Sequence, residues 1–110
     1  MCIRDRSEHG ASSAELLMPL VYKLSEDYKI DLGLLINKIT NQPSGILEIN
    51  KGSLSVNSDA DICIFNPEHS WEINSKTLIS EGKNTPFLNQ NFTGKVSSTF
   101  FNGNIVFIGT

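Results

Sequence analysis

The chain has 110 residues, of which 39% are hydrophobic and 19% are charged, and its formal net charge is -3. This apolar content is typical of a folded domain and excludes a chain that is disordered along its whole length. The acidic balance argues against nucleic acid as a partner, and the short apolar runs argue against a membrane-spanning helix, so we expect neither nucleic acid nor membrane as a partner.

The first part of the chain predicts an amphipathic helix over residues 12–27, where leucines recur at helical spacing. Ser12 and Glu15 have the Ser-x-x-Glu spacing of a capping box, in which each side chain binds a free backbone N–H at the start of the helix. Pro19 lies inside this segment and removes one backbone hydrogen bond, which predicts a kink or a late start.

A second helix is expected to begin after Asp31, whose carboxylate can accept a hydrogen bond from a backbone N–H of the first turn. This helix should stop near Asn41, because Pro43 disfavours helical backbone in the residue that precedes it. One further short helical turn is expected over residues 44–49.

The second half of the chain has a strand-like hydrophobic pattern. Leu54 and Val56 alternate with serines, which predicts a half-buried strand. Residues 62–65 form a continuous apolar run, which is typical of a strand covered on both faces, and Cys63 is then expected to be a buried, reduced thiol. Pro67 should end this strand.

The end of the chain predicts a β-hairpin. Residues 94–101 and 104–108 flank Asn102-Gly103, a dipeptide that favours a two-residue turn because both residue types tolerate a left-handed backbone. A shorter strand is expected over residues 71–73.

Asp59-Ala60-Asp61 places two carboxylates on the same side of the chain, after a turn predicted at Asn57. The pair can bind a metal ion or act in acid/base catalysis, or it can cap the turn by accepting backbone N–H groups, which its position before a strand favours. His69 lies in a polar segment and is expected to be a solvated loop residue. Two cysteines and two histidines without a Cys-x-x-Cys pair argue against a closed zinc site.

His9 and Gly10 precede the first predicted helix, so their backbone amides are expected to lie at the positive end of that helix. Such a position suits an anion. The charges near the N-terminus follow a three-residue start with no apolar core after them, which is not the form of a signal peptide. We therefore expect a cytoplasmic protein.

Three stretches of the sequence, taken together and in their order, resemble the C-terminal end of bacterial dihydroorotases of the amidohydrolase superfamily. Residues 52–67 read GSLSVNSDADICIFNP, where a strand ends in a turn and Ala-Asp opens the next strand. Residues 82–87 read GKNTPF and are followed by Gly94-Lys95-Val96 and the hairpin. Residues 9–20 are similar to the family's Phe-Gly-x-x-Gly-Leu-Glu-Thr-x-x-Pro-Leu stretch, with His9 in place of Phe.

The resemblance implies an α/β fold, namely the C-terminal part of an amidohydrolase (β/α)₈ barrel together with strands of the accompanying small β-sandwich. Residues 1–6 match nothing in the family and would form a foreign leader. Residues 7–50 would be the terminal helices of the barrel, and residues 51–110 the C-terminal part of the β-sandwich domain.

The resemblance also implies an enzyme, dihydroorotase, the zinc hydrolase that interconverts N-carbamoyl-L-aspartate and (S)-dihydroorotate in pyrimidine biosynthesis. The family's Zn²⁺ ligands lie upstream of the first residue, so the resemblance assigns no catalytic or metal-binding residue here and implies an inactive fragment. It does assign substrate binding to His9 and Gly10, because the backbone of the family's Phe-Gly pair contacts the substrate carboxylate.

Other functions remain open at this point. A related cyclic amidase of the allantoinase or dihydropyrimidinase type has the same fold and a similar C-terminal segment. A dihydroorotase-like subunit without catalysis would act as a partner of aspartate carbamoyltransferase, and a homo-oligomer is equally compatible with the sequence. A free-standing interaction domain is the least specific alternative.

Overall fold

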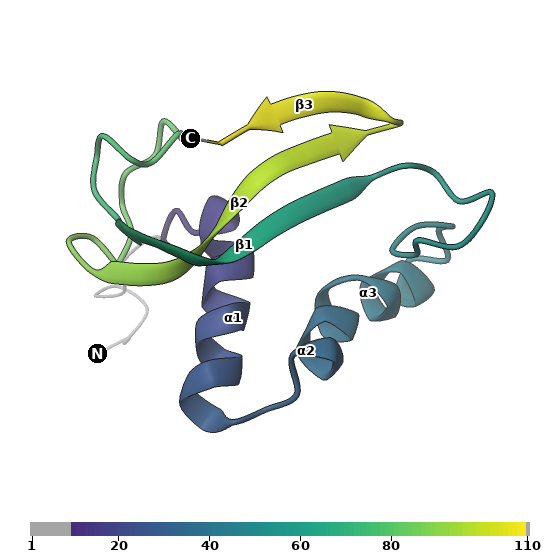
Figure 1. The fold of residues 1–110 in the computed structure, drawn as a ribbon, viewed down its shortest axis with the longest axis horizontal. Helices are drawn as coiled ribbons and strands as arrows, with labels where there is room; N and C mark the ends of the chain where they lie inside the picture. The colour runs from purple at the N-terminus through teal and green to yellow at the C-terminus, as the bar shows by residue number, and fades with distance from the viewer. Residues whose placement is uncertain (1–9, 110) are drawn as a thin grey trace, which may run out of the picture.

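The computed structural model describes residues 10–109 as a small sheet with helices along one side of it (Figure 1). The helical elements are the 3-10 turn η2 (Ala14–Leu16) and the α-helices α1 (Leu17–Tyr28), α2 (Leu32–Ile39) and α3 (Asn41–Ile46). The strands β1 (Ile62–Glu72), β2 (Asn91–Phe101) and β3 (Asn104–Ile108) form one antiparallel sheet in the order β1-β2-β3. The mixed α and β composition that the sequence predicts is therefore present. None of the helices in residues 10–109 has the length and apolar character needed to cross a membrane.

The first helix starts late, as Pro19 predicts. The α-helix begins at Leu17, so Pro19 falls in its first turn, where no intrahelical partner exists for a backbone N–H. The expected capping box is wrong, because Ser13 rather than Ser12 precedes the helical segment and no side chain caps it. The Glu15 carboxylate instead binds a distant loop, which is described below.

The second helix is capped as expected. Asp31 Oδ2 accepts a hydrogen bond of 2.9 Å from the Leu34 N–H, and α2 follows directly. The further helical turn also exists, but it is α3 and begins at Asn41, three residues earlier than the expected 44–49. Pro43 lies in the first turn of α3, so it starts a new helix instead of only ending the previous one.

The predicted strand around Leu54 and Val56 is wrong. Both residues lie in an irregular segment between α3 and β1, with Leu54 80% and Val56 90% exposed. Alternation alone does not make a strand, because a strand also needs a partner for its backbone groups. The turn at Asn57 is confirmed, with a left-handed φ of 70°.

Strand β1 runs through Pro67 rather than ending there. The pairing with β2 is irregular between Asn66 and Ser70, so Pro67 occupies a bulge where its missing N–H costs no ladder hydrogen bond. Trp71 therefore belongs to the same strand, opposite Phe92, and does not begin a strand of its own. His69 is exposed as expected, but it lies in this strand and not in a loop.

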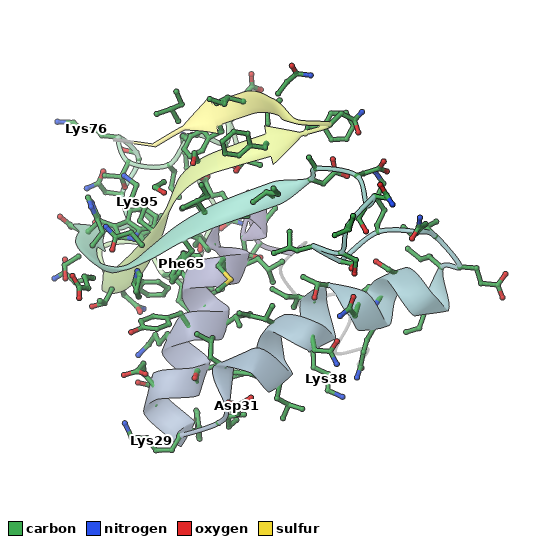
Figure 2. All side chains as sticks on the ribbon, turned by 45° about the vertical axis from the view of Figure 1, so that its right-hand side comes forward. Lys29, Asp31, Lys38, Phe65, Lys76 and Lys95 are labelled. Carbon is green, nitrogen blue, oxygen red and sulfur yellow. The ribbon has the colours of Figure 1, made fainter. Side chains whose placement is uncertain are left out.

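The expectation that residues 62–65 are covered on both faces is also wrong. Cys63 is exposed, and Ile64 is 47% exposed. The reason is that β1 is an edge strand of the described sheet and only part of its length contacts a helix. In Figure 2, Phe65 lies on β1 near α1, and its ring meets that of Tyr22 at 5.5 Å.

The predicted hairpin is confirmed. Asn102 and Gly103 have φ of 49° and 78°, and they join Phe101 to its pairing partner Asn104. Positive φ at both turn positions is the signature of a type I′ turn, whose twist matches that of the two strands.

The core is small and lies at one end of the sheet. Its four buried side chains are Leu16, Ile73, Leu78 and Phe92. Three partly buried side chains pack against them: Leu20, Trp71 and Phe87. These residues join the start of the helical segment, the loop between β1 and β2, and β2 itself. The cluster thereby packs η2 and the loop at residues 73–90 against β2.

Candidate functional site

The segment that contains Gly10 is held against the loop between β1 and β2. The Ser12 N–H donates to the Asn84 carbonyl oxygen at 2.6 Å, and Asn84 Nδ2 donates to the Gly10 carbonyl oxygen at 3.0 Å. Gly10 has a φ of 100°, which a residue with a side chain rarely adopts. Gly82 lies so close to Ser12 that a Cβ there would overlap Ser12 Oγ.

A second connection comes from Glu15, one turn further along. Its two carboxylate oxygens accept hydrogen bonds of 3.1 Å from the backbone N–H groups of Ile79 and Ser80. Burial raises the pKa of Glu15, but the hydrogen bonds from Ser80 and Ile79 and the charge of Lys83 outweigh burial and lower it below its ordinary value. The ionised carboxylate is therefore the form that ties the helical segment to the loop.

Replacement of Glu15 by Gln is expected to destabilise the chain by roughly 1–2 kcal/mol at pH 7, because one backbone N–H keeps only a neutral acceptor and the other loses its acceptor. Since the pKa is lowered in the folded state, the contribution is present above the ordinary Glu pKa of about 4.3 and is lost as the pH falls through the folded-state value. Urea unfolding at pH 7 and pH 3 measures the effect. The free energy of unfolding should fall between pH 7 and pH 3 in the natural sequence, and it should fall less in Glu15→Gln. Glu26→Gln, at an exposed position of the same helical region, is the control, and an equal effect there would contradict the assignment.

Of the two residues predicted to bind substrate, the structure describes only Gly10. His9 lies outside the described residues. Gly10 is exposed and precedes Ser13, the residue before η2, so its peptide group lies near the start of the helical segment but not in its first turn. The contact with Asn84 could not be found from the sequence, because the two residues are far apart along the chain.

The Asp59-Ala60-Asp61 carboxylates form a clasp with Lys51. Lys51 Nζ lies 2.7 Å from Asp59 Oδ2 and 2.7 Å from Asp61 Oδ2, and Asp61 Oδ1 accepts a 2.9 Å hydrogen bond from the Asn102 N–H. That backbone hydrogen bond and Lys51 lower the pKa of Asp61. Asp61 thus accepts a hydrogen bond from a backbone N–H, as expected of a capping residue. The donor, however, belongs to the distant hairpin turn and not to the turn just before β1.

The described residues do not fit a zinc centre. Within residues 10–109, no group of three or more His, Cys, Asp or Glu side chains is placed so that it could hold a metal ion. Both carboxylates of the acidic pair are instead bound by the Lys51 ammonium group.

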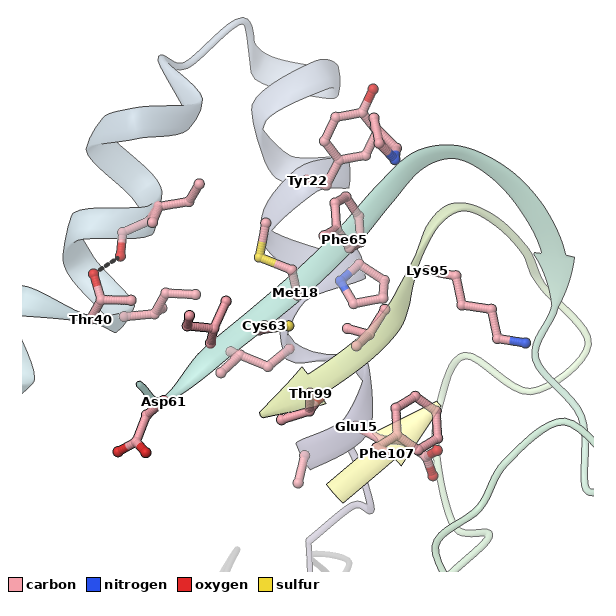
Figure 3. Close-up of a pocket in the computed structure, with 18 of the residues that line it drawn as sticks. Glu15, Met18, Tyr22, Thr40, Asp61, Cys63, Phe65, Lys95, Thr99 and Phe107 are labelled. Carbon is pink, nitrogen blue, oxygen red and sulfur yellow. Dashed lines mark hydrogen bonds between the residues drawn. The ribbon is translucent and has the colours of Figure 1, made fainter. Parts of the chain in front are cut away.

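A groove lies between the helices and the sheet, beside the place where α1 contacts the sheet (Figure 3). Its volume is about 1260 Å³, and its walls come from α1, α2, β1 and β2. The lining is mainly apolar and includes Met18 and Tyr22 on α1, Ile36 on α2, and Cys63 and Phe65 on β1. The sequence predicted an apolar face made by the leucines of the first helix and did not single out Met18 or Tyr22. It also could not show that α1 touches the sheet at only part of its length, as at the Tyr22–Phe65 ring contact, and leaves an open groove beside it.

Known proteins match this chain over most of its length. Residues 5–106 match the sequence profile of the amidohydrolase family. A dihydroorotase of Syntrophus aciditrophicus is 37% identical over 99 residues, which are 90% of this chain and 23% of that protein. A dihydroorotase-like protein of Pseudomonas aeruginosa is 33% identical over 103 residues, which are 94% of this chain and 24% of that protein.

The crystal structure of dihydropyrimidinase from Brevibacillus agri NCHU1002 has a TM-score of 0.75 to this chain and is 25% identical in sequence. The match covers 81% of this chain and 20% of that one. The chain thus spans about a quarter of the length of the curated relatives named above.

Proposed function

Because the chain belongs to the amidohydrolase family, we propose that it is the C-terminal part of a cyclic amidohydrolase, namely a dihydroorotase. Residues 7–50 would be the last helices of the (β/α)₈ barrel and residues 51–110 the C-terminal part of the β-sandwich. The substrates would be N-carbamoyl-L-aspartate and dihydroorotate. The observation that carries the proposal is the 37% identity to a dihydroorotase over 90% of this chain.

The uncovered apolar surface supports a place within a longer polypeptide. Leu17, Leu34 and Ile64 are about half exposed, and together with the groove they leave much of the helices and of β1 without a packing partner. A stable single domain seldom exposes so much continuous apolar surface. The preceding barrel and sandwich segments would cover it.

The zinc ions of the parent enzyme would be held by residues outside the described part of this chain. When bound, zinc polarises the amide carbonyl of the ring. In this chain, Gly10 and its neighbour His9 would instead contribute to substrate binding.

We expect the 110-residue chain alone to have no zinc-dependent hydrolase activity and to bind dyes that report exposed apolar surface. Dialysis against Zn²⁺ followed by metal analysis, activity assay and sedimentation measures this. Stoichiometric zinc together with hydrolase activity, or a chain that binds no such dye, would contradict the proposal.

The direct test is a chimera in which residues 7–110 replace the matching segment of the Syntrophus aciditrophicus dihydroorotase. The purified chimera is assayed on dihydroorotate, allantoin and dihydrouracil. Activity on dihydroorotate within about 10-fold of the intact host is expected, because the host supplies the remainder of the protein. A chimera that folds and binds zinc but opens no dihydroorotate would overturn the proposal.

A second candidate is a cyclic amidase of the dihydropyrimidinase type, which the TM-score of 0.75 to a dihydropyrimidinase favours. The same three-substrate assay on the protein that naturally carries this segment separates the two. The coding sequence before residue 7 would also decide between an enzyme and a non-catalytic partner of aspartate carbamoyltransferase, since the latter would lack the metal-binding residues.

A further inference from the structure

Asn84 binds the chain on both sides of Ala11. Its side-chain Nδ2 donates to the carbonyl oxygen of Gly10 at 3.0 Å, and its backbone carbonyl accepts from the Ser12 N–H at 2.6 Å. The peptide group before Ala11 and the peptide group after it are therefore both oriented by one residue.

This arrangement determines where the Ala11 N–H points. The C=O and N–H of a trans peptide point in opposite directions, and the described residues contain no cis peptide bond. Because the Gly10 carbonyl points to Asn84, the Ala11 N–H points away from it. Ala11 is exposed, and within residues 10–109 no group accepts a hydrogen bond from its N–H.

The loop that carries Asn84 is anchored independently of Gly10. Leu78 and Thr85, on either side of it, are 5% and 6% exposed. Lys83 Nζ donates to the Leu78 carbonyl oxygen at 2.6 Å, and Glu15 binds the loop through two further backbone N–H groups. Asn84 therefore presents its amide from a fixed platform, although its own side chain is exposed.

We propose that Asn84 is a positioning residue, which directs the backbone N–H of Ala11 toward the anionic group of the substrate. The inference rests on the proposed function, because it places the anion beside the Gly10 segment. A backbone N–H held in advance binds a carboxylate without the cost of ordering the segment at each encounter.

The test uses the chimera with Asn84→Ala and Asn84→Asp, which remove the amide donor, and Asn84→Gln, which keeps one. Asn91→Ala, at an exposed position of β2, is the matched control. We expect Asn84→Ala and Asn84→Asp to raise the KM for dihydroorotate about 10-fold with kcat changed by less than about 3-fold. Asn84→Gln should recover part of the loss, and Asn91→Ala should have no effect.

A KM within 2-fold of the unsubstituted chimera would overturn the inference. So would a fall in kcat accompanied by a lower thermal midpoint, because that pattern indicates a structural role. Failure of the proposed function looks different, since the unsubstituted chimera is then inactive on dihydroorotate. Hydrogen exchange at the Ser12 amide of the 110-residue chain separately reports the clamp, and it should accelerate in Asn84→Ala.

Discussion

Replacement of Phe92 by Ala is expected to destabilise the chain by roughly 3–5 kcal/mol, the usual cost of removing a buried Phe side chain. Phe92 is 2% exposed, and its ring meets the edge of Phe87 at 5.6 Å. The cost is high because the described core has only four buried apolar side chains. Few neighbouring side chains can therefore move into the cavity that the missing ring would leave. Hydrogen exchange at the Ile73 amide, which donates to the Gln90 carbonyl oxygen at 2.9 Å, should accelerate at least about 100-fold.

Phe101 provides the matched control, because it lies on the same strand and is 56% exposed. Phe101→Ala should change stability by less than about 1 kcal/mol. Equal acceleration of Ile73 exchange in both variants would show that burial in this cluster does not stabilise the chain.

Replacement of Gly94 by Ala is expected to cost roughly 2–4 kcal/mol, because two effects add. Gly94 is buried and has a φ of 104°, which is strained for any residue with a side chain. A Cβ at this position would also overlap the tip of the Phe65 ring. Trp71 Nε1 donates to the Gly94 carbonyl oxygen at 2.8 Å, so a shift of this backbone should change Trp71 fluorescence and lower the urea midpoint.

The two effects can be separated with Phe65→Ala. If overlap with the ring contributes, Gly94→Ala should cost about 1 kcal/mol less in the Phe65→Ala background than in the natural sequence. Gly45→Ala is the control for glycine replacement, because a Cβ there meets nothing within 4 Å and Gly45 lies in α3. It should leave stability unchanged or raise it by up to about 1 kcal/mol, and a large loss there would contradict the steric argument.

The elements that sequence predicted well depend on neighbouring residues. Asp31 caps α2 through a hydrogen bond to a residue three positions away, and Asn102-Gly103 makes its turn with its own backbone. Pro19 delays α1 because of a missing N–H in its own residue. In each case the residues that interact are close in the sequence, so their pattern is visible there.

The resemblance to a known family identified residues 9–20 and 82–87 as separate motifs, and only the structure shows that they meet. Glu15 illustrates why the local interpretation failed. Its spacing from Ser12 is that of a capping box, yet its carboxylate binds Ile79 and Ser80, which lie 64 and 65 positions away. Two charge-assisted hydrogen bonds to backbone N–H groups stabilise that arrangement more than a local cap would.

By itself, then, the sequence determined the family, the helix and hairpin signals, and the turn chemistry, because these depend on residue type and short spacing. The tertiary structure alone decided the partner of Glu15, the clamp of Asn84 on both sides of Ala11, and the passage of β1 through Pro67. It also decided that Cys63 is exposed. The physical reason is that burial and long-range pairing depend on which surfaces meet in the folded chain. The sequence of an apolar run is the same whether another element covers it or leaves it exposed in a groove.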